Sequence, residues 1–319
     1  SLPDTRHQKE GTSHTSQLVA ATMRLTVSFR RRKGASSVIV DVGGSVTVDR
    51  FTELLAEKTK VHKHRQGIKC FEDGAVVRLT GRLKTLDEYG ITENSELEMK
   101  DLGPQFSYRG VFIIEYLGPI LILLAYAARP AWLYGAAAAD AEWNDVAKLG
   151  LLAWMLHFLK REFETFFVHR FSRPTMPLAN LFKNSTYYWG FALMVGYPLC
   201  SPVYAPPCEH RVLAGGLLMA LSELGNLAVH VTLRNMRPKE GSDKRVPPTG
   251  PLFFVSCPNY TFEVLGWVGF SLMTNIAMAW GFTFVGLAQM TQWALGKHAG
   301  YVKQDKMLRR RKAIIPFII

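Results

Sequence analysis

One apolar segment in the second half of the chain carries five polar side chains at helical spacing: Glu223, Asn226, His230, Arg234 and Arg237. At about 100° per residue they fall within a sector of roughly 80°, so a helix here would present one polar stripe and otherwise apolar faces. Such a stripe is costly against lipid and is expected to face protein or a water-filled cavity. Two arginines at one end suit a phosphorylated ligand, because guanidinium groups bind phosphate through two parallel hydrogen bonds. The alternative is that the stripe serves helix packing and the arginines only extend toward the membrane surface.

A second polar group opens the next apolar segment. Asn259, Tyr260 and Glu263 lie within about one helical turn, so we expect them to share one face. A tyrosine beside a carboxylate can donate a proton or polarise a carbonyl group. The alternative is an interfacial tyrosine of the kind that is enriched at membrane surfaces.

Further charged residues stand in apolar surroundings. Glu115 lies in the middle of an apolar run, where a carboxyl group is costly and is retained mostly for a function. Lys160 and Glu164 are four residues apart and predict an ion pair at a membrane surface, which we interpret as structural. The sequence has no P-loop and no Gly-rich fingerprint after a strand, so a soluble Rossmann cofactor domain is excluded.

Apolar segments long enough to hold these residues follow one another after residue 105. A helix needs about 20 apolar residues to cross a bilayer. We predict six spans, at Phe106–Ala128, Val146–His169, Tyr187–Leu199, Val212–Leu233, Leu252–Met278 and Ala279–Leu295. The third is short and ends among prolines, which predicts a bent or partly re-entrant segment. Lysine and arginine gather after the fourth segment and near the C-terminus, which predicts that both chain ends lie in the cytosol.

The charge balance also favours a membrane protein over a nucleic-acid-binding protein. The 319 residues carry a net charge of +12, but the excess lies largely at the ends of apolar segments, where basic residues meet anionic lipid headgroups. The four cysteines show neither metal-ligand spacing nor a disulfide pattern, so no metal is predicted. The first residues lack the apolar core of a signal peptide, and we expect the first domain to stay in the cytosol.

The first third of the chain predicts a soluble domain. Residues 1–22 are polar and are expected to form a disordered leader. Apolar and polar residues alternate from Met23 to Phe29, as in a half-buried strand, and the pattern up to residue 102 predicts strand, strand, helix and three further strands. This order, with the turn at Leu86–Ile91, resembles the ubiquitin-like β-grasp fold; the alternative is another small α+β domain. The predicted fold class is a small α+β domain at 23–102 followed by an all-α membrane bundle of about six helices at 103–319.

Several motifs in the apolar part are similar to one enzyme family. The segments are KREFETFFVHRFS at 160–172, TMP at 175–177, FKN at 182–184, YYWGF at 187–191, SCPNY at 256–260, GKH at 296–298 and IIPF at 314–317. They resemble the very-long-chain trans-2-enoyl-CoA reductases, which belong to the steroid 5α-reductase superfamily and also carry a ubiquitin-like N-terminal domain. The resemblance covers residues 23–319.

The resemblance implies NADPH-dependent reduction of a trans-2-enoyl-CoA to the saturated acyl-CoA, the last step of each fatty-acid elongation cycle. It implies catalytic roles for Tyr260 and Lys160, with Glu263 beside the tyrosine. Glu115 corresponds to a glutamate that steroid reductases use near the substrate carbonyl. The cofactor-binding residues implied by the resemblance and by the polar stripe are Asn226, His230, Arg234, Arg237, Asn259, His298, Tyr301 and Arg311. One departure is the segment Val302–Leu308, which lacks the acidic stretch usual in relatives.

The implied location is the endoplasmic reticulum membrane, and the implied partners are a long-chain trans-2-enoyl-CoA, the bilayer and other elongation enzymes, with no nucleic acid. Two alternatives remain open: a steroid or polyprenol 5α-reductase, and a non-catalytic scaffold of the elongation complex. The ubiquitin-like domain and the motif Cys257–Tyr260 favour the enoyl-CoA reductase over the first. The polar stripe argues against the second, because a scaffold has no need of such residues inside a membrane.

Overall fold

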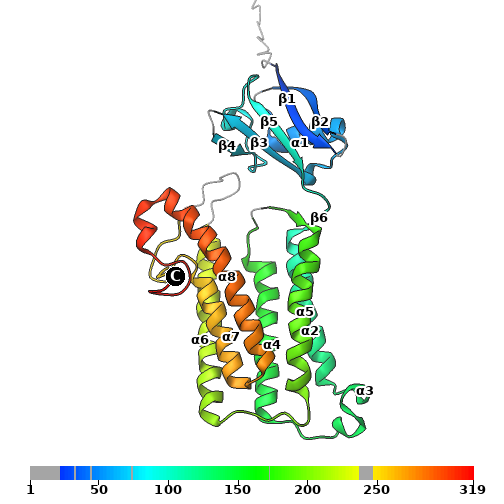
Figure 1. Ribbon diagram of the computed structural model, residues 1–319, viewed down its shortest axis with the longest axis vertical. Helices are drawn as coiled ribbons and strands as arrows, with labels where there is room; N and C mark the ends of the chain where they lie inside the picture. The colour runs from blue at the N-terminus through cyan, green and yellow to red at the C-terminus, as the bar shows by residue number, and fades with distance from the viewer. Residues whose placement is uncertain (1–21, 32–33, 44, 73–74, 172, 237–246) are drawn as a thin grey trace, which may run out of the picture. The chain divides into compact units, whose positions relative to one another are not determined.

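The computed structural model describes residues 22–31, 34–43, 45–72, 75–171, 173–236 and 247–319. The chain divides into two compact units, Ser1–Asp101 and Leu102–Ile319 (Figure 1). All of the predicted leader except Thr22 lies outside the described residues, and Thr22 begins the first strand.

The first unit is a five-stranded sheet with one helix packed on it. Its elements are β1 (Thr22–Arg31), β2 (Gly34–Gly43), α1 (Val48–Thr59), β3 (Gln66–Glu72), β4 (Ala75–Arg78) and β5 (Glu96–Asp101), with short 3₁₀ turns at Lys63–Arg65 and Asp87–Tyr89. The strand order is β2-β1-β5-β3-β4, with β1 and β5 parallel and the other pairs antiparallel. The element order predicted from the sequence is confirmed.

The period-two alternation of β1 explains the core of this unit. Leu25 and Val27 point to one face and are fully buried, together with Phe51 and Leu55 of α1. The side chain of Thr47 accepts a hydrogen bond from the Arg50 amide, and this N-cap fixes where α1 begins.

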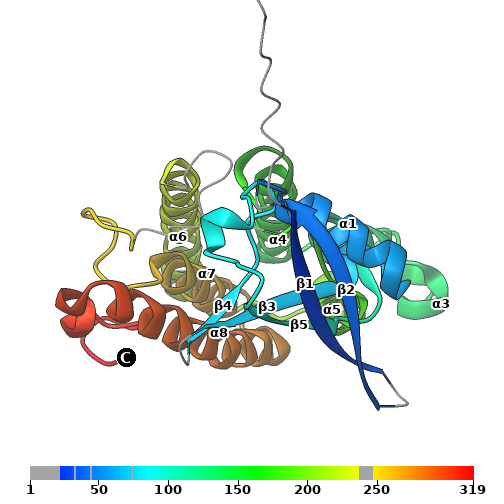
Figure 2. The same cartoon turned by 90° about the horizontal axis from the view of Figure 1, so that it is seen from above.

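The second unit is mostly helical. Its long helices are α2 (Tyr108–Ala127), α4 (Asp145–Phe163), α5 (Leu178–Cys200), α6 (Glu209–Asn235), α7 (Pro258–Thr274) and α8 (Ala277–Gln304). Shorter elements are β6 (Gln105–Ser107), β7 (Thr175–Pro177), α3 (Ala131–Tyr134) and 3₁₀ turns at Ala136–Ala138 and Lys306–Arg310. Seen from above, α7 lies between α6 and α8 (Figure 2).

The backbones of α6 and α7 touch where two glycines face each other. A Cβ atom on Gly215 would lie 2.5 Å from the Gly269 carbonyl oxygen, and one on Gly269 would lie 2.6 Å from the Gly215 carbonyl oxygen. Only residues without side chains permit this approach, so any substitution at either position would force the helices apart.

Helix boundaries differ from the predicted spans at several ends, and α8 continues to Gln304 beyond the predicted end at Leu295. The third span was predicted to be short, but α5 starts at Leu178 and continues through Pro198 to Cys200. Polar residues in the first turns of α5 lower the mean hydropathy there, so the start of this helix was not predicted as part of an apolar span. The fifth span was predicted from Leu252, but α7 starts only at Pro258. Residues before it pair with the C-terminal segment, where the Ser256 amide donates to the Lys312 carbonyl at 2.8 Å.

The outer face of the bundle is rich in leucine. Exposed leucines recur three or four residues apart on three helices: Leu117, Leu121 and Leu124 on α2, Leu149, Leu152, Leu156 and Leu159 on α4, and Leu213, Leu217, Leu221 and Leu224 on α6. By length and apolar composition, α2 and α6 alone among the described helices meet the criteria for a membrane span, so the count of six spans stays a prediction. In a soluble protein, leucine side chains are mostly buried and charged side chains are mostly exposed. This helical unit exposes rows of leucine and buries charged side chains such as Glu115 and Glu164.

Candidate functional site

Lys160 lies at the junction between α4 and the polar stripe of α6. Its Nζ is 2.6 Å from Glu223 Oε2 and donates a hydrogen bond to Asn226 Oδ1 at 2.8 Å. Glu164 Oε1, the partner predicted from the sequence, lies farther away at 3.7 Å. The predicted pair with Glu164 is therefore present, but it is buried rather than at a surface, and the shorter ion pair of Lys160 joins two helices.

The same group extends to α7 through Asn226 and His157. Asn226 Nδ2 donates to the Asn259 carbonyl oxygen at 2.9 Å and to Glu263 Oε2 at 3.3 Å. The imidazole of His157, only 2% exposed, has Nδ1 2.7 Å from Glu223 Oε1 and Nε2 3.5 Å from Glu263 Oε1. Side chains of three helices are thus tied together by hydrogen bonds and ion pairs.

Glu164 is a second carboxylate near Lys160, and it brings further polar side chains into contact with this group. Glu164 has no exposed side-chain surface and receives a charge-assisted hydrogen bond from Arg161 Nη1 at 2.5 Å. His230 Nδ1 lies 3.0 Å from Glu164 Oε1, and Arg161 Nη2 donates to the Tyr116 hydroxyl at 2.9 Å. We call the whole set the inter-helix polar network, comprising Tyr116, His157, Lys160, Arg161, Glu164, Glu223, Asn226, His230 and Glu263.

The local structure of α4 helps to place Glu164. The helix begins after Asn144, whose side-chain oxygen accepts hydrogen bonds from the amides of Val146 and Ala147. After Phe163 it widens into a π-helical turn over Glu164–Val168. Such turns shift the helical register and recur at functional sites.

Glu164, His169 and His230 offer potential metal-ligand atoms within 4.8 Å of one another. Arg161 is bound to the same carboxylate, and its positive charge opposes a metal cation at this position. We therefore interpret the three residues as part of a charge network rather than as a metal centre.

Glu115 precedes Tyr116 of the network on α2 and has no described hydrogen bond or ion pair with Lys160 or Glu263. It is 2% exposed, and its Oε2 accepts a hydrogen bond from Asn184 Nδ2 of α5 at 2.7 Å. Among the described residues, no hydrogen bond or ion pair links Glu115 to Lys160. The structure accordingly divides the residues predicted to be catalytic into separate groups.

Tyr260 belongs to another of these groups. Lys297 Nζ of α8 donates a hydrogen bond to the Tyr260 hydroxyl at 2.8 Å and lies 4.5 Å from the centre of its ring. The sequence predicted a shared face for Tyr260 and Glu263, but residues three apart differ by about 60° around a helix. Because α7 lies between α6 and α8, that offset turns Glu263 toward α6 and Tyr260 toward α8.

The predicted cofactor residues fall into two regions. Asn226, His230 and the Asn259 carbonyl belong to or contact the inter-helix polar network. The C-terminal residues lie elsewhere: His298 Nδ1 is 2.8 Å from Ser256 Oγ, and Arg311 Nη1 donates to the Pro248 carbonyl at 2.7 Å. Tyr301 is half-buried on α8.

The end of the polar stripe carries the group best suited to phosphate. Arg234 is half-buried and forms no hydrogen bond or ion pair with the residues that the structure describes. A guanidinium group in this state can bind a phosphate group through two parallel hydrogen bonds. Arg237, the other predicted arginine, lies outside the described residues.

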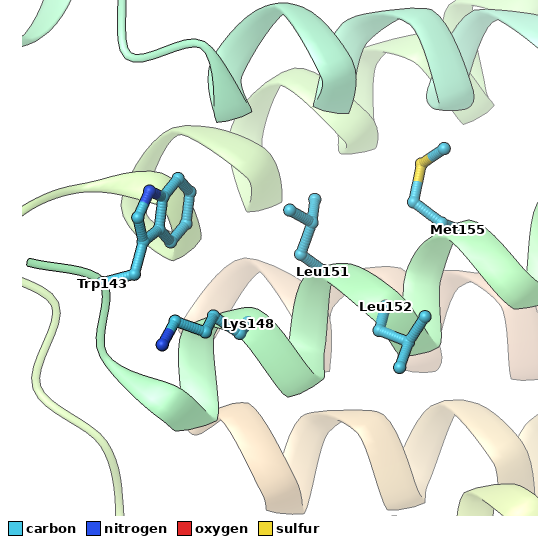
Figure 3. A pocket seen from close by; sticks show the side chains of 5 residues that line it. All are labelled: Trp143, Lys148, Leu151, Leu152 and Met155. Carbon is cyan, nitrogen blue, oxygen red and sulfur yellow. The ribbon is translucent and has the colours of Figure 1, made fainter. Parts of the chain in front are cut away.

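An apolar groove of about 360 Å³ lies on the first half of α4, away from the polar network. Figure 3 shows its lining side chains, which are Trp143, Lys148, Leu151, Leu152 and Met155. Lys148 at its edge forms an ion pair with Asp145 at 2.8 Å. A groove of this composition fits an alkyl chain rather than the charged part of a substrate.

Sequence reasoning missed His157 and Arg161 as members of the site. Both lie within one turn of Lys160, and a charge scan along α4 would have grouped them on one side of the helix. Glu164 and Glu223 were noticed in the sequence but not proposed as site residues, although both contact Lys160.

Two named proteins match nearly the whole chain. A protein named "Putative enoyl-CoA reductase" from Trypanosoma brucei brucei is 45% identical over 295 residues, covering 90% of this chain and 98% of that protein. The very-long-chain enoyl-CoA reductase of Dictyostelium discoideum is 39% identical over 300 residues, covering 92% and 98%. The chain belongs to the very-long-chain enoyl-CoA reductase family.

Two further matches cover parts of the chain. A family model described as 3-oxo-5-alpha-steroid 4-dehydrogenase matches residues 174–319, which include α5 to α8. The solved C-terminal ubiquitin-like domain of mouse tubulin-specific chaperone e matches with a TM-score of 0.25 at 20% identity, covering 30% of this chain and 97% of that chain.

Proposed function

We propose that this chain reduces the trans-2 double bond of a long-chain enoyl-CoA, with NADPH as the source of hydride. The observation that carries the proposal is the enclosed polar network around Lys160, which lies inside a bundle with leucine on its outer face. Relatives that match over nearly the whole chain bear the name of this activity. Buried charged groups of this number are expensive in a membrane and are retained for chemistry or binding.

The chemistry of the reaction sets what the residues must do. Conjugate reduction delivers hydride to C3, places negative charge on the thioester oxygen and then adds a proton at C2. NADPH, when bound, supplies the hydride. Lys160 and Tyr260 are the two groups that we propose to polarise the thioester oxygen or to provide the proton.

The phosphates of NADPH need cations, and Arg234 supplies one. We propose that Arg234 and Arg237 hold a phosphate at the end of α6, while Asn226 and Asn259 orient the groups around Lys160. Asn226 uses both amide hydrogens and one lone pair of its oxygen within the protein: Lys160 donates to its oxygen, and its nitrogen donates to Asn259 and Glu263. Its role in our proposal is therefore to fix Lys160 rather than to contact the cofactor.

Our proposal for the location is supported by the outer surface. We propose a multi-pass protein of the endoplasmic reticulum membrane, with both ends in the cytosol, that works beside other enzymes of fatty-acid elongation. The leucine faces of α2, α4 and α6 support membrane embedding. An acyl chain that partitions into lipid could then enter from the bilayer, and the apolar groove on α4 offers a place for its end.

A second candidate is the reduction of a 3-oxo-Δ4-steroid. The match of residues 174–319 to a model described as 3-oxo-5-alpha-steroid 4-dehydrogenase favours it. Both substrates present a carbon–carbon double bond conjugated to a carbonyl group, so the same polar groups can serve either.

A direct comparison of substrates tests the proposal. The purified protein is given NADPH with a long-chain trans-2-enoyl-CoA or with a 3-oxo-Δ4-steroid, and the products are identified by mass spectrometry. We expect turnover of the enoyl-CoA only. Turnover of the steroid alone would replace the proposal with the second candidate, and turnover of neither by folded protein would refute both.

A further inference from the structure

The hydroxyl of Tyr260 has one described partner, the ammonium group of Lys297. Nζ lies 2.8 Å from the phenolic oxygen and 4.5 Å from the ring centre, so the cation contacts both the lone pairs and the π face of the same side chain. The tyrosine ring also packs 6.2 Å from the ring of Trp293 and against the small apolar cluster around Met290 and Ala294. These contacts restrict the ring to one position.

The direction of this hydrogen bond has a chemical consequence. A lysine ammonium group has three N–H donors and no acceptor. Lys297 therefore donates, the phenolic oxygen accepts, and the hydroxyl proton of Tyr260 is left to point elsewhere. No acceptor for that proton exists among the described residues. Tyr260 is thus held as a hydrogen-bond donor with an open position.

Lys297 has no acidic partner within the part of the chain that the structure describes. It forms its only described hydrogen bond with Tyr260, on a helix that faces α7. Lys160 differs, because Glu223 and Glu164 surround its ammonium group and balance its charge. The positive charge of Lys297 is left to act on the Tyr260 hydroxyl.

We propose that Lys297 is a positioning residue for Tyr260, and that together they stabilise the negative charge that forms on the thioester oxygen of the enoyl-CoA. The inference rests on the proposed function. As hydride adds to C3, the electron pair of the C2=C3 bond forms a C1=C2 bond, and the carbonyl electron pair moves to the thioester oxygen. The thioester oxygen accepts a hydrogen bond from the Tyr260 hydroxyl. The phenolic oxygen itself accepts a hydrogen bond from Lys297. The carbonyl re-forms when C2 takes up one proton from the solvent, so that one hydride and one proton together complete the saturated thioester.

The test is a double-mutant cycle on the full chain. Lys297→Met keeps an unbranched apolar stem but removes the charge and the donors. We expect kcat with NADPH and a long-chain trans-2-enoyl-CoA to fall by about tenfold, with KM for NADPH within about twofold of wild type. In the Tyr260→Phe background the same change should lower kcat by less than about twofold, because the hydroxyl through which Lys297 acts is gone.

Two further variants exclude a general structural effect. Lys297→Arg keeps a charged donor and should restore kcat to within about threefold of wild type. Lys303→Met, a change at an exposed lysine on the same helix, should leave kcat and the unfolding temperature unchanged.

The outcomes separate the inference from the proposed function. The role of Lys297 would be overturned if Lys297→Met lowered kcat equally in the wild-type and Tyr260→Phe backgrounds. It would also be overturned if Lys297→Met had near-normal kcat. Enoyl-CoA reduction would stand in both cases. Absence of enoyl-CoA turnover in folded wild-type protein would overturn both. A Lys297→Met variant that fails to fold is replaced in the cycle by Lys297→Gln, which retains a polar donor without the charge and is expected to show the same loss.

Discussion

The ammonium group of Lys160 lies 2.6 Å from a carboxylate oxygen of Glu223, and this pair joins α4 to α6 inside the bundle. Both side chains are mostly buried, and each has further polar contacts, with Asn226 on one side and His157 on the other. An ion pair in this position is favourable only while both partners are present, because a single buried charge is costly.

Removal of one partner should therefore destabilise the protein more than removal of both. We expect Glu223→Gln and Lys160→Met each to lower the free energy of unfolding by about 3 kcal/mol. The double variant should lose less than the sum of the two. Thermal unfolding in detergent measures this, with the exposed pair Lys148 and Asp145 as the matched control. Additive losses would show that the two residues act independently.

The arginine at the end of α6 should affect cofactor binding alone. Arg234→Ala removes a donor that has no partner among the described residues, so the fold should be unchanged. Loss of a charge-assisted contact to phosphate costs about 2 kcal/mol, which corresponds to a roughly thirtyfold higher KM for NADPH. We expect the same of Arg237→Ala. Steady-state kinetics test both, and Arg109→Ala, at an exposed position on α2, is the control. An unchanged KM in both variants would show that the phosphates bind elsewhere.

Asn226→Ala should act differently from the arginine variants. Its side chain links Lys160, Glu263 and the Asn259 carbonyl, so its loss frees three groups at once. We expect a lower kcat and a lower unfolding temperature rather than a selective rise in KM for NADPH. A change confined to KM would place Asn226 in direct contact with the cofactor.

The hydroxyl of Tyr260 should matter for the chemical step. Tyr260→Phe keeps the ring and its packing against Trp293 and removes only the oxygen that Lys297 contacts. We expect the single-turnover rate of hydride transfer to fall by about a hundredfold with NADPH binding nearly intact. Tyr126→Phe, on α2, is the matched control. A rate within about threefold of wild type would transfer the catalytic role to Lys160 or Glu115.

The first unit should be dispensable for turnover. The contacts that build the polar network all lie within Leu102–Ile319, which is a compact unit by itself. A truncated chain beginning at Leu102 should therefore reduce enoyl-CoA in detergent at a rate within about threefold of the full chain. Loss of activity in a folded, monodisperse truncation would show that the first unit completes the site.

The sequence predicted the strands and helices better than it predicted which side chains contact each other across helices. Alternation in β1 and long apolar runs identified strands and helices, because these patterns are local. The start of α5 was missed because Asn184 makes that stretch polar, although its amide is used inside the bundle to bind Glu115. The pairs Lys160–Glu223 and Tyr260–Lys297 join different helices, and periodicity within one helix does not say which helix lies opposite.

The glycine contact between α6 and α7 bears on how a bulky substrate could enter. Where Gly215 and Gly269 meet, the two helices lie too close to slide or rotate past each other without a clash of backbone atoms. Asn226 of α6 and Glu263 of α7 lie farther along this same helix pair. Part of the site is therefore held by two helices that cannot move relative to each other at the glycine contact. We therefore expect α6 and α7 to stay fixed relative to each other when a long acyl chain enters. The movement that admits the chain is then expected in the other helices of the bundle.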